Sequence, residues 1–123
     1  MKQFKELTKA EEQVMQILWD LNSAFVKDII ELMPEPKPAY NTVSTIIRIL
    51  ETKGFVDHKA YGKTHEYFPI ISRETYTSFS LNNLLSGYFN GSFQNLVSFF
   101  AKDNKINSKD LEKLLKEVKK QKL

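Results

Sequence analysis

Polar side chains that can read DNA bases recur along one stretch of the sequence. The stretch contains Asn41, Thr42, Ser44, Thr45 and Arg48. Asn can pair with adenine and Arg with guanine, while Thr can offer a hydroxyl to a base or a methyl group to thymine. At 100° per residue in a helix, all of them except Thr42 would lie on one side. We therefore predict a DNA-contacting surface, although the same polar side could instead bind a protein partner.

The same stretch has an apolar side that would hold such a helix against a core. Its members fall on an arc opposite the polar side; they are Val43, Ile46, Ile47 and Leu50. Ile49 lies outside this arc, so we expect it at an edge or against a neighbouring element. Gly54 is a suitable residue to end the helix. A helix anchored on one side and polar on the other fits the second helix of a helix-turn-helix pair, which enters the major groove.

Two further helices are predicted before this one. Thr8 and Glu11 have the spacing of a capping box, which begins a helix. Apolar residues then recur at i, i+3, i+4 and i+7 in two runs, Val14, Ile17, Leu18 and Leu21, followed by Val26, Ile29, Ile30 and Met33. The prolines within residues 34–38 would end the second helix. We expect Trp19 and Tyr40 to be packing residues.

A β-hairpin is predicted after the three helices. Residues 55–61 and 64–70 are rich in aromatic and β-branched side chains and flank Gly62-Lys63, a turn signal. Lys59 and Lys63 would lie on this hairpin, which could act as a wing that contacts the DNA backbone. Residues 36–65 hold five basic and two acidic residues, a balance of +3. Such a positive segment is expected of a phosphate-contacting element.

Short helices are predicted in the rest of the chain. Ser72-Arg73-Glu74 begins one, Asn90-Gly91 breaks it, and Asn107-Ser108 caps the last. The later helices carry apolar stripes made of Phe93, Leu96, Val97 and Phe100, then Leu111, Leu114 and Leu115. Helices this short are marginal alone and must bury such side chains. We expect them to pair two copies of the chain into a homodimer. The alternative is that they fold back on their own reader domain.

The sequence closely resembles the penicillinase-repressor family of the BlaI/MecI type. The resemblance rests on LTKAEEQVMQILWDL, AFVKDIIELM, AYNTVSTIIRILETKGFVDH and YGKTHEYFPIISRETY, and it extends from Leu7 through the C-terminal helices. It implies a mostly α fold with a small β-hairpin wing, in which a winged helix-turn-helix is followed by a C-terminal helical dimerisation segment. The corresponding domains are residues 1–71, which bind DNA, and residues 72–123, which dimerise.

The resemblance also implies a function and its residues. Such proteins look like dimeric repressors of a palindromic operator, with Asn41, Thr42, Ser44, Thr45 and Arg48 in the reading helix and Lys59 and Lys63 in the wing. In the β-lactam systems a membrane sensor metalloprotease triggers cleavage of the repressor, at a place similar to residues 96–101 here. The family's Asn-Phe is replaced by Phe99-Phe100, so the sequence does not identify the inducing signal.

Other classes of function find little support in the sequence. The chain has no Cys, which excludes thiolate metal sites, including those of a copper-responsive branch of the family, and fits a reducing cytoplasm. No motif indicates an enzyme or a cofactor. His58 and His65 would lie on opposite strands, but without a supporting carboxylate they make a poor metal site. We expect no signal peptide and no membrane span, and therefore a cytoplasmic protein. The alternative function is a winged-helix adaptor for protein partners.

Overall fold

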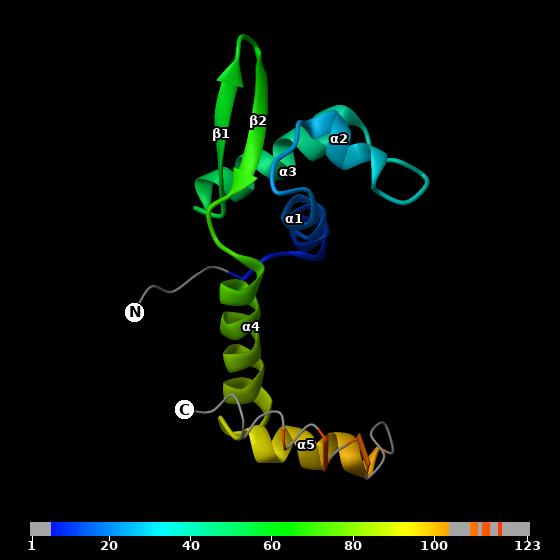
Figure 1. The fold of residues 1–123 in the computed structure, drawn as a ribbon, viewed down its shortest axis with the longest axis vertical. Coiled ribbons are helices and arrows are strands. Elements are labelled where there is room, and N and C mark those ends of the chain that lie inside the picture. Colours follow the sequence, from blue (N-terminus) through cyan, green and yellow to red (C-terminus); the bar gives the residue numbers. More distant parts are fainter. Residues whose placement is uncertain (1–5, 104–108, 111, 114–115, 117–123) are drawn as a thin grey trace. The chain divides into compact units, whose positions relative to one another are not determined.

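The computed structural model describes residues 6–103, 109–110, 112–113 and 116. In this part of the chain the helices and strands follow one another in the predicted order. The elements are α1 (Lys9–Leu21), α2 (Val26–Glu31), α3 (Tyr40–Thr52), β1 (Val56–Tyr61), β2 (Thr64–Pro69), α4 (Arg73–Tyr88) and α5 (Phe93–Lys102) (Figure 1). The described fold is thus mostly helical with one antiparallel hairpin, which confirms the predicted fold class. The chain divides into two compact units between Phe79 and Ser80.

The first helix begins at the predicted capping box. The Thr8 hydroxyl accepts the N–H of Glu11 at 3.2 Å, and the Glu11 carboxylate accepts the N–H of Thr8 at 3.0 Å. These two bonds satisfy N–H groups that the first turn of a helix leaves without a backbone partner. Asn22 ends the helix in a left-handed conformation with φ 71°. The apolar stripe of α1 buries Val14 and Leu18 completely.

The second helix is shorter than its apolar pattern suggested. It ends at Glu31, and Met33 lies beyond it, although the Met33 side chain is still buried. Lys37 folds back over this end, and its ammonium group donates to the carbonyls of Ile30, Glu31 and Met33 at 3.2, 2.9 and 2.9 Å. A cation at a helix C-terminus satisfies free carbonyls and complements the helix dipole. Lys37 therefore caps α2.

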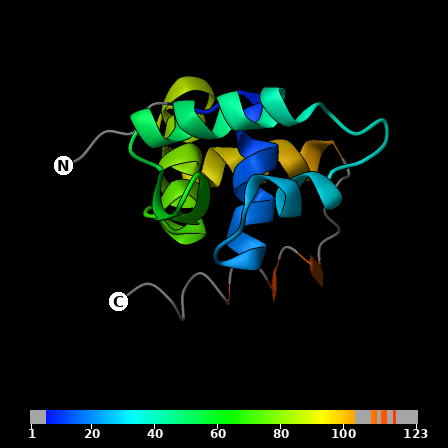
Figure 2. The same cartoon turned by 90° about the horizontal axis from the view of Figure 1, so that it is seen from above.

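The third helix lies on the core through the apolar side that the sequence predicts. Val43, Ile47 and Leu50 have no exposed surface, and Ile46 packs against the core while partly buried. This side contacts both α1 and α2, and Figure 2 shows α3 running crosswise to α1. Ile49 is 41% exposed, which agrees with the expectation that it lies at an edge. Burial of such aliphatic side chains stabilises by about 1.5–3 kcal/mol each, so the orientation of α3 is strongly fixed.

The hairpin turns at Gly62-Lys63, as the sequence predicts. Tyr61 is opposite Thr64, and His58 is opposite Tyr67. Gly62 adopts φ +64° in the turn, a conformation that costs glycine little. Ala24, between α1 and α2, exchanges two backbone hydrogen bonds with Tyr67, of 2.9 and 2.8 Å. This bridge attaches the base of the hairpin to the helices.

The start of α4 is held against α1 within the first unit. Trp19 Nε1 donates to the carbonyl of Ile71 at 2.8 Å, and the Arg73 guanidinium lies 5.6 Å from the centre of the Trp19 ring. Arg73 also pairs with Asp20 at 2.7 Å. The Tyr76 hydroxyl accepts the N–H of Leu7 at 3.1 Å. Trp19 is therefore a packing residue, as predicted.

The second unit contains the rest of α4 and the helix α5. Asn90 and Gly91, which lie between these two helices, each have a positive φ. The Ser92 hydroxyl caps α5 by accepting the N–H of Asn95 at 3.2 Å. Val97 is buried, while Phe93, Leu96 and Phe100 are half-buried. The other predicted dimerisation residues, Leu111, Leu114 and Leu115, and the predicted cap at residues 107–108 lie outside the described residues. No described helix is long and apolar enough to cross a membrane.

Candidate nucleic-acid interface

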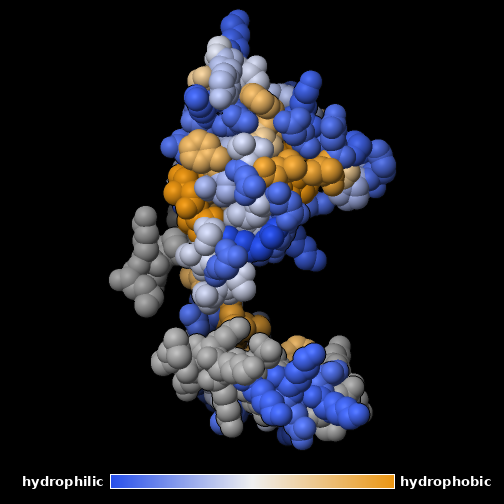
Figure 3. Space-filling model, viewed as in Figure 1, coloured by the Kyte–Doolittle hydropathy of each residue, from blue (hydrophilic) through white to orange (hydrophobic). Residues whose placement is uncertain are grey.

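The predicted base-reading residues lie on the side of α3 that faces away from the core. Asn41, Thr42, Thr45 and Arg48 are exposed, and Ser44 is half-buried. The face of the first unit seen in Figure 3 is mostly hydrophilic around smaller hydrophobic patches. The polar side chains of α3 are thus available to a partner from outside, because the apolar side alone holds the helix in place. Their contact with DNA stays a prediction.

Tyr40 is a residue whose place the sequence analysis predicted wrongly. It is predicted to be a core or packing residue, but it is 56% exposed. It lines a shallow hollow together with Phe25, Lys27 and Thr64, where α2, α3 and the hairpin meet. Its position as the first residue of α3 explains the exposure, because Tyr40 precedes the first buried residue of the helix by nearly one turn.

The predicted wing residues lie on the exposed hairpin. Lys63 is in the turn, and Lys59 is on β1 with its ammonium group 5.5 Å from the centre of the Tyr61 ring. Both side chains are exposed. A lysine at a hairpin tip can approach a phosphate without any change in the packing of the core. The wing therefore presents positive charge at its tip and along β1.

Two of the basic residues counted in the positive segment have partners inside the protein. Lys37 caps α2, as described above, and Lys53 pairs with the buried Glu11 at 2.7 Å. The positive charge that the segment can offer to DNA is therefore smaller than its composition suggests. The other three basic residues of the segment, Arg48, Lys59 and Lys63, are exposed.

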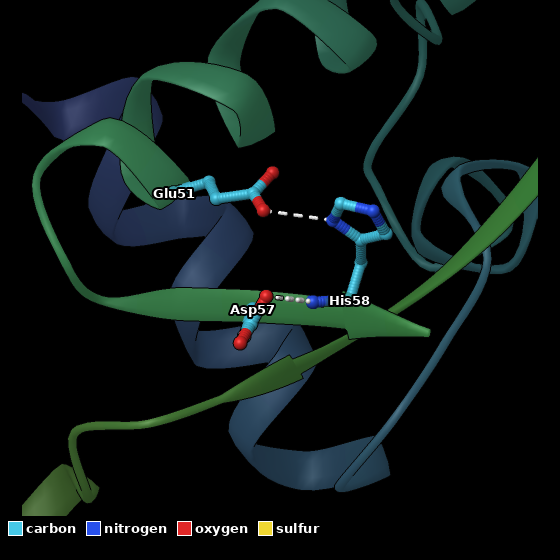
Figure 4. A group of neighbouring side chains, drawn as sticks. All are labelled: Glu51, Asp57 and His58. Carbon is cyan, nitrogen blue, oxygen red and sulfur yellow. Dashed lines mark hydrogen bonds and ion pairs between the residues drawn. The ribbon is translucent and has the colours of Figure 1, made fainter. Parts of the chain in front are cut away.

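The end of α3 and the hairpin are joined by a contact between a carboxylate and an imidazole, and a second imidazole stacks on the first. Glu51 Oε2 lies 2.7 Å from His58 Nδ1, and the His58 and His65 rings stack with centres 4.1 Å apart and planes 9° apart. Asp57 Oδ1 accepts the backbone N–H of His58 at 2.8 Å. Figure 4 shows the Glu51 carboxylate and the His58 ring pointing toward one another. The expectation that no carboxylate supports the histidines was wrong, because Glu51 comes from a different element.

Tyr67 lies on β2, opposite His58 in the hairpin. Burial raises the pKa of its phenol, the Glu51 carboxylate raises that pKa further, and the Arg48 guanidinium opposes the increase. Arg48 is thus close enough to Tyr67 to act on it electrostatically. The arginine predicted to read a base therefore extends from α3 beside the base of the wing.

Comparisons with known proteins agree with this arrangement. The MecI methicillin resistance regulatory protein of Staphylococcus aureus (strain N315) is 28% identical over 110 residues, which are 89% of each chain. The penicillinase repressor of Bacillus licheniformis is 24% identical over 115 residues, 93% of this chain and 90% of that one. The solution structure of the DNA-binding domain of the repressor BlaI superposes with a TM-score of 0.53 at 28% identity. It covers 62% of this chain and 94% of that domain.

The sequence pattern of a family described as penicillinase repressor matches residues 7–120, nearly the whole chain. This match, the relatives and the winged-helix neighbour confirm the resemblance and indicate a DNA-binding repressor and not an enzyme. The chain belongs to the penicillinase repressor family.

Proposed function

We propose that the protein represses transcription by binding a palindromic operator as a homodimer, with α3 of each copy in a major groove and the hairpin beside the DNA backbone. The observation that carries this proposal is the division of α3 into an apolar side packed on the core and a largely exposed polar side. A helix must have this division to be held firmly while its polar groups approach base edges.

Each polar residue has a proposed role in this complex. Asn41, Thr45 and Arg48 contact base edges, with Thr42 and Ser44 at the rim of the contact. Lys59 and Lys63 contact phosphates, which position the protein without reading sequence. On this proposal residues 1–71 form the DNA-binding domain and residues 72–123 the dimerisation segment. A bacterial repressor of this kind would act in the cytoplasm.

The proposed dimer is supported by the apolar stripe of α5. Phe93, Leu96 and Phe100 of this stripe are half-buried, and the neighbouring Phe99 is 49% exposed. Adjoining apolar side chains that are left partly exposed favour contact with another surface. We include Phe93, Leu96, Val97 and Phe100 in the interface, together with Leu111, Leu114 and Leu115 of the following segment. Two-fold symmetry of the dimer would match the symmetry of a palindromic operator.

Selection of DNA sites from a random pool by the full chain tests the proposal. We expect an inverted repeat, bound with an affinity that falls steeply with salt. Thr45→Ala should change the selected sequence, while Thr77→Ala, which alters an exposed threonine of α4, should leave it unchanged. If the chain shows no sequence preference at physiological salt, the repressor proposal fails and a protein-binding adaptor becomes the better explanation.

Release of the operator is proposed to follow cleavage in α5 by a membrane sensor metalloprotease. The Phe99-Phe100 bond lies in α5 with Phe99 half exposed, and a cut there would divide the proposed dimer interface. Co-expression with a metalloprotease encoded beside the gene, followed by mass spectrometry of the chain, tests this step. An intact chain under inducing conditions would show that release occurs in another way.

A further inference from the structure

We propose that Glu51, Asp57 and His58 bind a divalent transition metal ion such as Zn²⁺ where the end of α3 meets the start of β1. The three residues each offer a donor atom, and these atoms all lie within 4.8 Å of one another. The inference does not depend on DNA binding, because it concerns the opposite end of α3 from Asn41 and can be tested without DNA.

The geometry brings an imidazole nitrogen and a carboxylate oxygen together before any ion binds. Glu51 Oε2 and His58 Nδ1 are 2.7 Å apart. Zinc bonds of about 2.0–2.2 Å in a tetrahedral site place two donors about 3.4 Å apart. The Glu51–His58 contact therefore has to open by less than about 1 Å to admit the ion. A movement of this size needs only a change of side-chain torsions.

Asp57 would complete the set by turning its carboxylate toward the other two. In the structure its Oδ1 accepts the N–H of His58 at 2.8 Å, so one oxygen is held beside the His58 backbone (Figure 4). Asp57 is exposed, and the side chains of His58 and Glu51 are 28% and 30% exposed. An ion can therefore reach the site from solvent, and water can occupy a fourth position.

The donor chemistry selects the kind of metal. Mg²⁺ and Ca²⁺ prefer sets made of oxygen alone, whereas an imidazole nitrogen with carboxylates suits zinc and similar first-row ions. Two carboxylates and a neutral imidazole also balance the charge of a divalent ion. The His65 ring, stacked on His58 at 4.1 Å, would hold the His58 ring in plane and is not itself in the donor set.

A bound ion would connect the last turn of the reading helix to the first strand of the wing. Glu51 belongs to α3, and Asp57 and His58 belong to β1. A ligand that binds the folded chain and not the unfolded one also raises stability by mass action. Metal binding should therefore raise the melting temperature of the full chain as well as produce heat on titration.

Titration calorimetry of the tag-free, chelator-treated full chain with ZnCl₂ tests the proposal. We expect one ion per chain, and at least tenfold weaker binding in His58→Asn and in Glu51→Gln. Glu66→Gln is a matched control, since it removes a carboxylate from the same hairpin but none of the proposed donors; it should bind within a few-fold of the unchanged protein.

Zinc binding is compared only for variants whose circular dichroism and melting temperature without metal match those of the unchanged chain. If His58→Asn or Glu51→Gln does not fold, Asp57→Asn takes its place. Replacement of Zn²⁺ by Co²⁺ should add visible absorption bands that disappear in the same variants. The proposal is overturned if no saturable zinc binding occurs at micromolar concentrations, if His58→Asn and Glu51→Gln bind like the unchanged chain, or if Mg²⁺ binds as tightly as Zn²⁺.

Discussion

Removing one member of the Glu11–Lys53 ion pair should weaken the fold by an amount that depends on which member is removed. The pair joins the first turn of α1 to the residue that follows α3, and so helps to fix the reading helix. The Glu11 side chain is 8% exposed and that of Lys53 is 19% exposed. An unpaired Lys53 can extend into water, whereas an unpaired Glu11 carboxylate would stay buried.

The expected magnitudes follow from this difference in burial. Lys53→Met leaves the carboxylate with the Thr8 N–H at 3.0 Å as a donor, and breaking a largely buried pair in this way costs about 3 kcal/mol of unfolding free energy. Glu11→Gln keeps an acceptor for Thr8 and leaves Lys53 partly in water, so its cost is about 1.5 kcal/mol. The double variant contains no buried charge, so it should be more stable than Lys53→Met alone.

Urea unfolding of the full chain and the three variants, at one fixed chain concentration, measures these differences. Lys27→Met, which removes an exposed lysine of α2, is the control and should change the free energy by no more than about 0.5 kcal/mol. If the double variant loses the sum of the two single losses, the members of the pair do not interact energetically and the reasoning is refuted.

The same pair makes stability depend on pH in a defined direction. Burial raises the pKa of the Glu11 carboxyl, but hydrogen bonds from Lys53 and Thr8 outweigh burial, and the pKa is lowered from 4.5. The folded value is below the unfolded one, so the stabilisation is complete above about pH 4.5 and is lost as the pH falls through the folded pKa. The free-energy difference between the unchanged chain and Glu11→Gln should therefore shrink during acid titration; a constant difference would contradict this assignment.

Three further changes test the proposed complex. Arg48→Ala should reduce discrimination at one base pair by about 1–3 kcal/mol in competition binding against single-base variants of the selected site; equal weakening on all sequences would show that Arg48 does not read a base. Lys63→Ala should weaken binding to all DNA sequences alike. It should also lower the slope of log K against log salt by about 0.9 for each phosphate that Lys63 neutralises. An unchanged slope would show that Lys63 does not bind the DNA backbone. Leu96→Asp places a charge at a half-buried position of the α5 stripe and should yield a folded monomer in sedimentation; a persisting dimer would exclude α5 from the interface.

The features that the sequence predicts well are those determined by near neighbours in the chain. The capping box needs only Thr8 and Glu11, three residues apart, and both bonds are present. The two sides of α3 follow from helical periodicity, and burial of Val43 and Ile47 confirms the apolar side. The hairpin turn at Gly62 follows from the glycine itself. Each of these patterns is complete within about a dozen residues.

The features that the sequence does not predict depend on contacts between different helices, strands and loops. Lys53 looks like a surface cation until its partner Glu11, 42 positions earlier, is known. Glu51 is only seven positions from His58, but the contact is not predicted because helical periodicity does not show that Glu51 faces a strand. The Ala24–Tyr67 bridge likewise joins a loop to a strand that no local pattern connects. The charge of the positive segment was overestimated for the same reason.

The position of Trp19 provides an optical probe of one junction in the molecule. It is the only tryptophan of the chain, its indole N–H bonds to Ile71, and the Arg73 guanidinium covers its ring. When the protein is excited at the red edge of its absorption, the emission therefore comes from Trp19. It reports on the place where α1 contacts the start of α4. Anything that loosened this attachment would expose the indole to water and shift its emission to longer wavelength, without an added dye.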